Sequence, residues 1–204
     1  MKKLLTILIA VCLWCQNVQS DDIRDLEIEG LSIGYSLLNL FNKDEIHSAI
    51  DEHRTFVYPD GKYKIIRTHT TLDSEIAKPI KEGLYDYVGT VIKTGDRKFT
   101  IYGIQARMYI TDETGTCPEE KGKIVNELKS DFPDAKIQEK KGPHSYDKTG
   151  KSIADYTWFV MSDGNISVSC TIWAGKLKER FKSNTLKVSI NSKKYADYLQ
   201  TAYK

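Results

Sequence analysis

The sequence is poor in the residues from which metal and thiol sites are built. It contains 4 cysteines and 4 histidines among 204 residues. After residue 20 only Cys117 and Cys170 remain, and no Cys-x-x-Cys pair or zinc-type spacing occurs. The nearest histidines, His47 and His53, stand six positions apart, whereas two ligands on one helix need a spacing of three or four. We therefore predict no metal ligand, no cofactor and no motif-defined catalytic residue.

An excess of either charge is also missing. The chain has 30 Lys and Arg against 28 Asp and Glu, and Lys2 and Lys3 belong to an N-terminal segment with no acidic residue. Without that segment the charges balance at 28 of each sign. Nucleic-acid binders carry a basic patch or stripe, and here no basic run is interleaved with aromatic residues. We therefore predict no nucleic-acid partner.

Only one long apolar run is present, and it lies at the N-terminus. Leu4–Cys15 covers 12 residues, fewer than the roughly 20 that span a bilayer core. A basic start precedes the run, and small residues follow at Val18 and Ser20. This order predicts a cleaved signal peptide at residues 1–20 and a periplasmic or secreted location. An uncleaved anchor, or a lipid on Cys12 or Cys15, is the alternative.

The pattern of residues 21–204 predicts a single α+β domain with no further membrane span. Runs rich in β-branched and aromatic residues are joined by short turns, which predicts an antiparallel sheet of hairpins with about three helices packed on one face. The predicted strands cover residues 26–30, 55–57, 63–68, 85–93, 99–110, 153–161, 165–173 and 186–190. The predicted helices cover residues 36–50 with a break at 42, 117–132 and 192–202. We predict a mobile polar loop at residues 140–152.

Capping signals fix where two of these helices begin. Thr116 is followed by Pro118 in the first turn and by Glu119 three positions after the cap. Asn42 followed by Glu45 is a capping-box pattern.

Cys117 and Cys170 allow two interpretations. Alternation in the strand 165–173 turns Cys170 toward the core, where the amphipathic helix that begins near Cys117 should pack. In an oxidising compartment the pair would close a loop of about 53 residues, a disulfide worth about 4 kcal/mol, provided that its Cα atoms lie within about 7 Å. The alternative is a reactive Cys117 thiol, because a helix start favours the thiolate.

Two short motifs resemble catalytic signatures but lack their context. Residues 145–152 (SYDKTGKS) end like a phosphate-binding loop, yet Ser145 occupies a glycine position and a predicted strand follows. Residues 30–34 (GLSIG) place Ser32 as in a nucleophile elbow, but no buried strand precedes it. Neither motif predicts an activity.

Several aromatic residues fall in the predicted strands, namely Tyr102, Tyr109, Trp158, Phe159 and Trp173. They could form a patch on the sheet surface. Aromatic strand residues more often pack in the core, and that is the position we predict for them.

Three segments carry a resemblance to known proteins. Residues 28–38 (IEGLSIGYSLL), 146–152 (YDKTGKS) and 168–173 (VSCTIW) resemble a group of uncharacterised small exported proteins of marine bacteria. The resemblance covers most of the chain after residue 20. It implies an exported, folded domain and no particular activity. Tyr35 departs from it, because an acidic residue is expected at that position.

Two classes of function remain open. The first is a non-enzymatic, exported or envelope-associated domain that binds an unknown protein or small ligand, with no indication of its oligomeric state. The alternative is a periplasmic hydrolase whose site is built from scattered carboxylates and histidines. A cleft that holds His69 or His144 beside an Asp or Glu would favour the hydrolase.

Removal of the signal peptide should leave a chain that begins at Asp21, give or take a few residues. The reason is that the small residues at 18 and 20 place the cut after residue 20. Intact-mass spectrometry of the exported protein measures the new terminus. A chain that keeps Met1 in the membrane fraction, or carries a lipid on Cys12 or Cys15, would contradict the prediction.

Overall fold

The computed structural model describes residues 22–51, 55–70, 85–111 and 116–202, so the predicted signal peptide and His53 lie outside the described residues. The strands are β1 (Glu27–Ile28), β2 (Leu31–Ser32), β3 (Thr55–Val57), β4 (Tyr63–Thr70), β5 (Tyr87–Lys93), β6 (Ile101–Ile110), β7 (Lys136–Pro143), β8 (Ile153–Val160), β9 (Gly164–Ile172) and β10 (Asn184–Ser192). The α-helices are α1 (Lys43–Asp51), α2 (Cys117–Asp131), α3 (Gly175–Phe181) and α4 (Lys193–Leu199), with 3-10 turns at Ile23–Asp25 and Leu37–Asn39.

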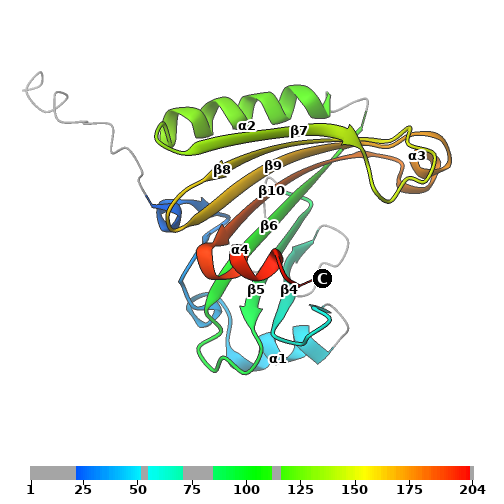
Figure 1. Cartoon of the computed structure of the whole chain (residues 1–204). Helices are drawn as coiled ribbons and strands as arrows, with labels where there is room; N and C mark the ends of the chain where they lie inside the picture. Colours follow the sequence, from blue (N-terminus) through cyan, green and yellow to red (C-terminus); the bar gives the residue numbers. More distant parts are fainter. Residues whose placement is uncertain (1–21, 52–54, 71–84, 112–115, 203–204) are drawn as a thin grey trace, which may run out of the picture.

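One large antiparallel sheet organises these elements (Figure 1). It has eight strands in the order β3-β4-β5-β6-β10-β9-β8-β7, and β1 pairs with β2 in a separate ribbon. The predicted α+β class with an antiparallel sheet is therefore confirmed. Within the described part of the chain, no helix is both long enough and apolar enough to cross a bilayer.

Side-chain alternation gives the sheet two different faces. Along β9, Ile166, Val168 and Cys170 are buried in the core, whereas Ser167 and Ser169 between them point to the opposite face. The neighbouring strands follow the same order, because the register sets apolar residues of β10 against the apolar residues of β9. One face of the sheet is therefore the floor of the core, and the other face is rich in polar groups.

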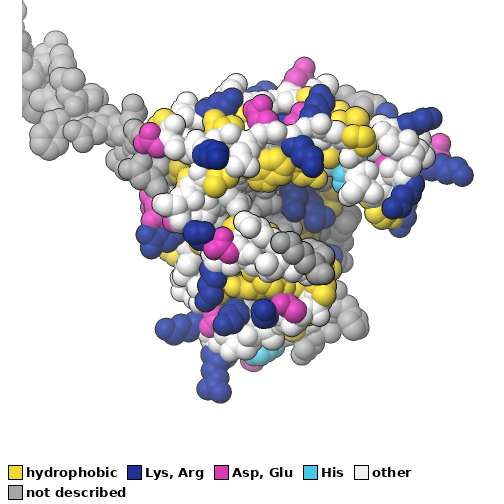
Figure 2. All heavy atoms as spheres, viewed as in Figure 1, with side chains coloured by type: hydrophobic (Ala, Val, Ile, Leu, Met, Phe, Trp, Pro, Cys, Tyr) yellow, Lys and Arg dark blue, Asp and Glu magenta, His cyan; other side chains and the backbone are white. Residues whose placement is uncertain are grey.

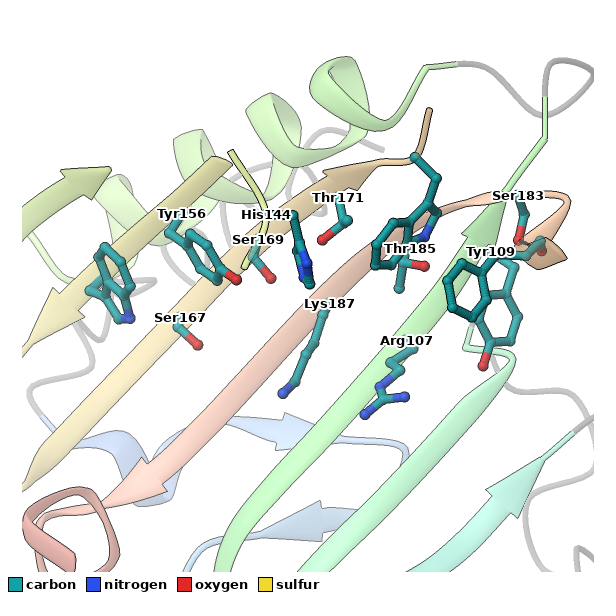
Figure 3. A pocket seen from close by; sticks show the side chains of 13 residues that line it. Arg107, Tyr109, His144, Tyr156, Ser167, Ser169, Thr171, Ser183, Thr185 and Lys187 are labelled. Atoms are coloured by element: carbon teal, nitrogen blue, oxygen red, sulfur yellow. Dashed lines mark hydrogen bonds between the residues drawn. The ribbon is translucent and has the colours of Figure 1, made fainter. Parts of the chain in front are cut away.

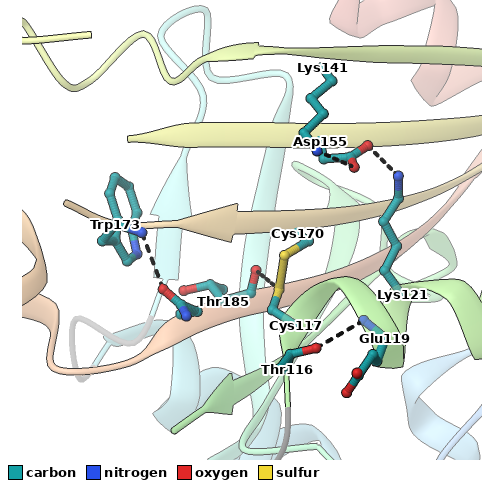
Figure 4. The surroundings of a disulfide bond; sticks show 10 residues. Thr116, Cys117, Glu119, Lys121, Lys141, Asp155, Cys170, Trp173 and Thr185 are labelled. Carbon is teal, nitrogen blue, oxygen red and sulfur yellow. Dashed lines mark hydrogen bonds and ion pairs between the residues drawn. A yellow bond between two sulfur atoms is a disulfide. The ribbon is translucent and has the colours of Figure 1, made fainter. Parts of the chain in front are cut away.

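The amphipathic helix α2 covers the apolar face (Figure 1). Its predicted cap is confirmed, because the Thr116 hydroxyl accepts a hydrogen bond of 3.4 Å from the Glu119 N–H. Leu128 is buried against the sheet. Lys121, also largely buried, forms an ion pair with Asp155 of β8 (Figure 4). Apolar burial and one charge pair together fix α2 on the sheet.

The predicted capping signals before α1 are also confirmed. The Glu45 N–H donates to Asn42 Oδ1 at 2.9 Å, and the Asn42 N–H donates to Glu45 Oε2 at 2.7 Å. Ser36 caps the preceding segment by accepting from the Leu38 N–H at 3.1 Å. That segment is a single 3-10 turn and not a full helical stretch, because the capping box starts a new helix three residues after it.

Helix α4 lies across the opposite face of the sheet. Gly103 of β6 makes this possible, since a Cβ there would stand 2.9 Å from the Tyr195 ring. The buried Tyr195 hydroxyl hydrogen-bonds the Tyr58 hydroxyl, and its ring centroid lies 5.3 Å from that of Tyr63. The one-sided helix packing that we predicted therefore describes α2, whereas α4 occupies one end of the second face.

Two elements lie where neither strand nor helix was predicted. Residues 140–143, which we expected in a mobile loop, are paired with β8 as the end of β7. The side chains of β7 are exposed on both faces at the edge of the sheet, so no alternation of apolar and polar residues marks it. Helix α3 begins at Gly175, and its N-cap residue Ala174 has no side chain that can accept a hydrogen bond, so the helix lacks the usual start signal.

The rest of that predicted loop, residues 144–152, is organised by Asp147. Its carboxylate accepts the Ser152 N–H at 2.7 Å, and the Thr149 N–H and hydroxyl at 2.9 and 2.7 Å. Hydrogen bonds from Ser152 and Thr149 hold the pKa of Asp147 well below its usual range. The Asp-x-Thr pattern in SYDKTGKS thus serves to fold a turn.

Cys117 and Cys170 lie at disulfide-bonding distance, which confirms the geometry that their pairing requires (Figure 4). Their Cα atoms are 5.7 Å apart, and both residues are buried. The bridge connects the first turn of α2 to the middle of β9.

Reduction of this bridge should lower the melting temperature by about 10 °C. Closing a 53-residue loop is worth about 4 kcal/mol in the chain-entropy model, and each kcal/mol shifts the midpoint of a chain of this size by about 2–4 °C. Calorimetry with and without reductant measures the shift. The melting temperature of a variant with both Cys117→Ala and Cys170→Ala should be the same with and without reductant. Two free thiols in the protein recovered from an oxidising compartment would contradict the prediction.

Candidate functional site

A groove lies on the face of the sheet opposite α2 (Figures 2 and 3). It holds about 410 Å³ and is lined by side chains from β6, β8, β9 and β10, by His144 after β7, and by residues in and around α3. Figure 2 shows Lys and Arg side chains inside this hollow, below a patch of apolar side chains and above α4. Small-ligand sites typically have volumes of about 300–1,000 Å³, so the groove can accept a small molecule.

Hydroxyl groups cover the floor of the groove. Ser167, Ser169 and Thr171 project from β9, and Thr185 projects from β10 (Figure 3). They are the polar half of the alternation whose apolar half forms the core on the other side of the sheet. Each hydroxyl can donate one hydrogen bond and accept two, which suits a ligand with several oxygens.

Aromatic rings form one wall of the groove. Tyr156 and Trp158 of β8 stack with centroids 5.1 Å apart and ring planes 6° apart. Along the groove follow His144 and Trp173, with centroids 4.7 Å apart, and then Phe181, whose centroid lies 4.6 Å from that of Trp173. This row offers ring faces and edges to the apolar part of a ligand.

Two cations face the aromatic wall from the middle of the floor. Lys187 of β10 and Arg107 of β6 lie directly opposite each other in the register of the two strands, and both side chains point into the groove (Figure 3). The lining residues that the structure describes include no Asp or Glu. Among the described residues, neither Lys187 nor Arg107 has an ion-pair partner. No described acidic group therefore balances the positive charge of these two side chains.

Burial and the neighbouring charge both act on Lys187. Removal from water, and secondarily repulsion by the Arg107 guanidinium, lower the pKa of Lys187 to about 8. Near neutral pH most of the Lys187 side chains are therefore charged, and a substantial fraction becomes neutral within one pH unit. A bound anion would favour the charged form.

Tyr87 of β5 holds Arg107 in place. The Arg107 guanidinium carbon lies 4.9 Å from the centroid of the Tyr87 ring, and the Arg67 guanidinium carbon lies 5.6 Å from the same ring. The neighbouring Gly89 leaves room for this ring, since a Cβ at position 89 would stand 2.5 Å from the Tyr87 hydroxyl oxygen. Cation–π contact thus orients Arg107 without neutralising it.

The site follows one straight row across the sheet. Tyr156 lies opposite Ser169, Ser169 opposite Lys187, Lys187 opposite Arg107, and Arg107 opposite Tyr87. Directly opposed residues have Cβ atoms about 4.5–5.5 Å apart. An aromatic ring, a hydroxyl, an amine and a guanidinium are therefore presented at regular short intervals.

The histidines and the serine motif have different positions. His144 lines the groove, but none of the described lining residues is an Asp or Glu. His47 lies on α1, and Ser32 is buried in β2. The side chain of His69, like all of His53, lies outside the described part of the structure. Within that part, no three or more His, Cys, Asp or Glu residues form a group that could hold a metal ion.

The aromatic residues divide between the two faces. The core position that we predicted is confirmed for Phe159, which is fully buried. It does not hold for Trp158, Trp173 and Tyr109, which line the groove. Tyr102 packs beside the tyrosines that hold α4. For the β8 pair the reason is the alternation itself, because Trp158 and Phe159 are consecutive and must face opposite ways.

Sequence reasoning missed Lys187 and Arg107, which dominate the charge of the groove. The available signal was the polar half of the strands. In β9 the run Ser167, Ser169 and Thr171 alternates with core residues, and in β10 Lys187 stands between two apolar residues. Only the apolar half of this pattern was used to predict the fold.

No known protein family, curated protein or solved structure matches this chain. The resemblance to exported proteins of marine bacteria stays a prediction. The function must therefore be inferred from the groove.

Replacing Lys187 with Met should stabilise the protein at pH 7 and remove a pH dependence. The folded-state pKa of Lys187 is about 8, and an unfolded lysine titrates near 10.4. Between these values the unfolded chain binds more protons, so this group makes the unfolding free energy rise with pH across the window, and its full cost is present below pH 8. The stability difference between wild type and variant should be on the order of 1–2 kcal/mol at pH 7 and should shrink toward pH 10.

Urea unfolding at several pH values measures this difference. Lys140→Met is the matched control, because Lys140 lies on the same face but is exposed on β7. The unfolding free energy of Lys140→Met should equal that of the wild type at every pH. A Lys187→Met curve that runs parallel to that of the wild type between pH 7 and 10 would show that the pKa of Lys187 is not lowered.

Proposed function

We propose that this protein is an exported, non-enzymatic binding protein whose ligand is a small organic anion that carries a ring. The observation that carries the proposal is the uncompensated Lys187–Arg107 pair, which faces a row of aromatic rings across a floor of hydroxyls. Export is supported by the predicted signal peptide and by the buried Cys117–Cys170 pair at bonding distance, which suits an oxidising compartment.

The chemistry of the groove limits the class of ligand that it can bind. Two adjacent cations without a carboxylate favour an anionic group, and a guanidinium can hold a carboxylate through two parallel hydrogen bonds. The Tyr156–Trp158 stack, two strands away from Lys187, suits a flat apolar ring. A polymer such as nucleic acid would need a longer basic stripe than two residues. A hydrolase that uses His144 would need a carboxylate beside it, and the described part of the groove lining supplies none.

The protein should bind 3-phenylpropionate, which carries one ring and one carboxylate, with a Kd on the order of 0.1 mM. The uncharged amide of the same acid should bind at least 10-fold more weakly, because it lacks the negative charge that pairs with Lys187 and Arg107. Calorimetry and quenching of Trp158 and Trp173 fluorescence provide two independent measurements.

Two arginine variants locate the binding. Arg107→Gln should weaken binding of the acid about 10-fold or more, and should leave the weak binding of the amide unchanged. Arg97→Gln removes an exposed arginine outside the groove and should change neither. Melting curves of both variants check that they are folded. Equal affinity for acid and amide, or no saturable binding of the acid at millimolar concentration, would refute the proposal.

A further inference from the structure

Lys187, which is half-buried, differs from the buried Lys121 in the groups that stand beside it. Lys121 reaches from α2 to the carboxylate of Asp155, which compensates its charge. Lys187 has Arg107 on one side and the Ser169 hydroxyl on the other. Among the described residues, no side chain forms a hydrogen bond or ion pair with the Lys187 amine. A lysine in this setting is an amine without an anion to hold its proton.

This setting is the one that makes a lysine reactive toward carbonyl groups. Only the neutral amine has a lone pair that can attack carbon, and desolvation or an adjacent cation increases the neutral fraction. With its pKa near 8, about half of Lys187 is neutral at pH 8, whereas well under 1 % of an ordinary surface lysine is. The groove around it is open to a small molecule and closed on one side by the aromatic wall.

We propose that Lys187 forms an imine with a ring-bearing 2-oxo acid, so that the groove captures this class of organic anion covalently and reversibly. The inference rests on the proposed anion-binding function and adds the carbonyl group to it. In a 2-oxo acid the carbonyl carbon is bonded directly to the carboxylate carbon. Arg107 can therefore hold the carboxylate while the adjacent carbonyl carbon lies within reach of Lys187 Nζ, because the two residues oppose each other on neighbouring strands.

The ring of the ligand then points across β9 to β8. On the other side of Lys187 the row continues through Ser169 to Tyr156, and Trp158 stacks on Tyr156. A ring one carbon beyond the carbonyl, as in phenylpyruvate, would extend from Lys187 toward this stack, which lies two strands away. The hydroxyls of Ser169 and Thr185 flank Lys187 and can hydrogen-bond the carbonyl oxygen.

The reaction is a condensation that needs no oxidant or reductant. The lone pair of the neutral Lys187 Nζ forms a bond to the carbonyl carbon, and the carbonyl oxygen takes up a proton to give a carbinolamine. A second proton transfer lets that oxygen leave as water, and a C=N double bond replaces the C=O bond. Both protons of the amine are accounted for in the released water. Hydrolysis reverses the sequence and releases the acid unchanged.

Reductive trapping tests the proposal. The folded, oxidised protein is incubated at pH 7.5 with phenylpyruvate and sodium cyanoborohydride, which reduces an imine to a stable secondary amine. Intact mass should show a single addition, and peptide mapping should place it on Lys187 at least 10-fold above any other lysine. As the pH is raised, labelling of Lys187 should level off above pH 8, while labelling of surface lysines continues to rise.

Two lysine variants serve as matched controls. Lys187→Arg keeps the positive charge but cannot form an imine, so it should lose the specific label, and its melting curve checks that it is folded. Lys140→Arg replaces an exposed lysine of the same sheet face and should be labelled like the wild type.

The outcomes separate this inference from the proposed function. Label spread evenly over surface lysines, or label that persists in Lys187→Arg, overturns the imine. If 3-phenylpropionate binds and phenylpyruvate is not trapped at Lys187, the imine is wrong and the anion-binding function stands. If neither acid binds, both proposals are wrong.

Discussion

The two faces of β6, β9 and β10 are the constraint on which the rest of the structure depends. In each strand one set of alternate residues must be apolar, because it packs in the core beneath α2. The other set faces the groove and can be polar. Cys170 packs into the core while Ser169 beside it faces the groove, and Leu186 packs into the core while Lys187 faces the groove. A one-residue slip of register would exchange the two sets, so the core fixes the site.

The apolar face also explains why the groove can be rigid. α2 is held there by apolar burial, by the Lys121–Asp155 pair and by Cys117 against Cys170, directly behind the floor of the groove. On the groove face, α4 is held at one end by the contact of Tyr195 with Gly103. The hydroxyls and cations therefore sit on strands that are secured from behind, and a ligand would meet a preformed surface with little ordering to do.

Elements with a local chemical signal could be predicted from the sequence. The capping box at Asn42 and the Thr116 cap fixed two helix starts, because those bonds form between residues three apart. β7 could not be predicted, since an edge strand exposed on both faces has no alternation. The groove was missed for a different reason. Lys187 and Arg107 are 80 positions apart and become neighbours only through the pairing of β10 with β6, a long-range register that no local pattern contains.

Lys187 lowers the stability of the free protein but favours the binding of an anion. An amine placed between a guanidinium and a hydroxyl gains nothing from its neighbours in the free protein, and burial disfavours its charge. Replacement by an apolar residue would suit the fold better, because it removes a partly buried charge that none of the described side chains balances. A ligand carboxylate would reverse that balance, because it supplies the negative charge that the lining lacks. The unbalanced positive charge therefore costs stability in the free protein and favours the binding of an anion.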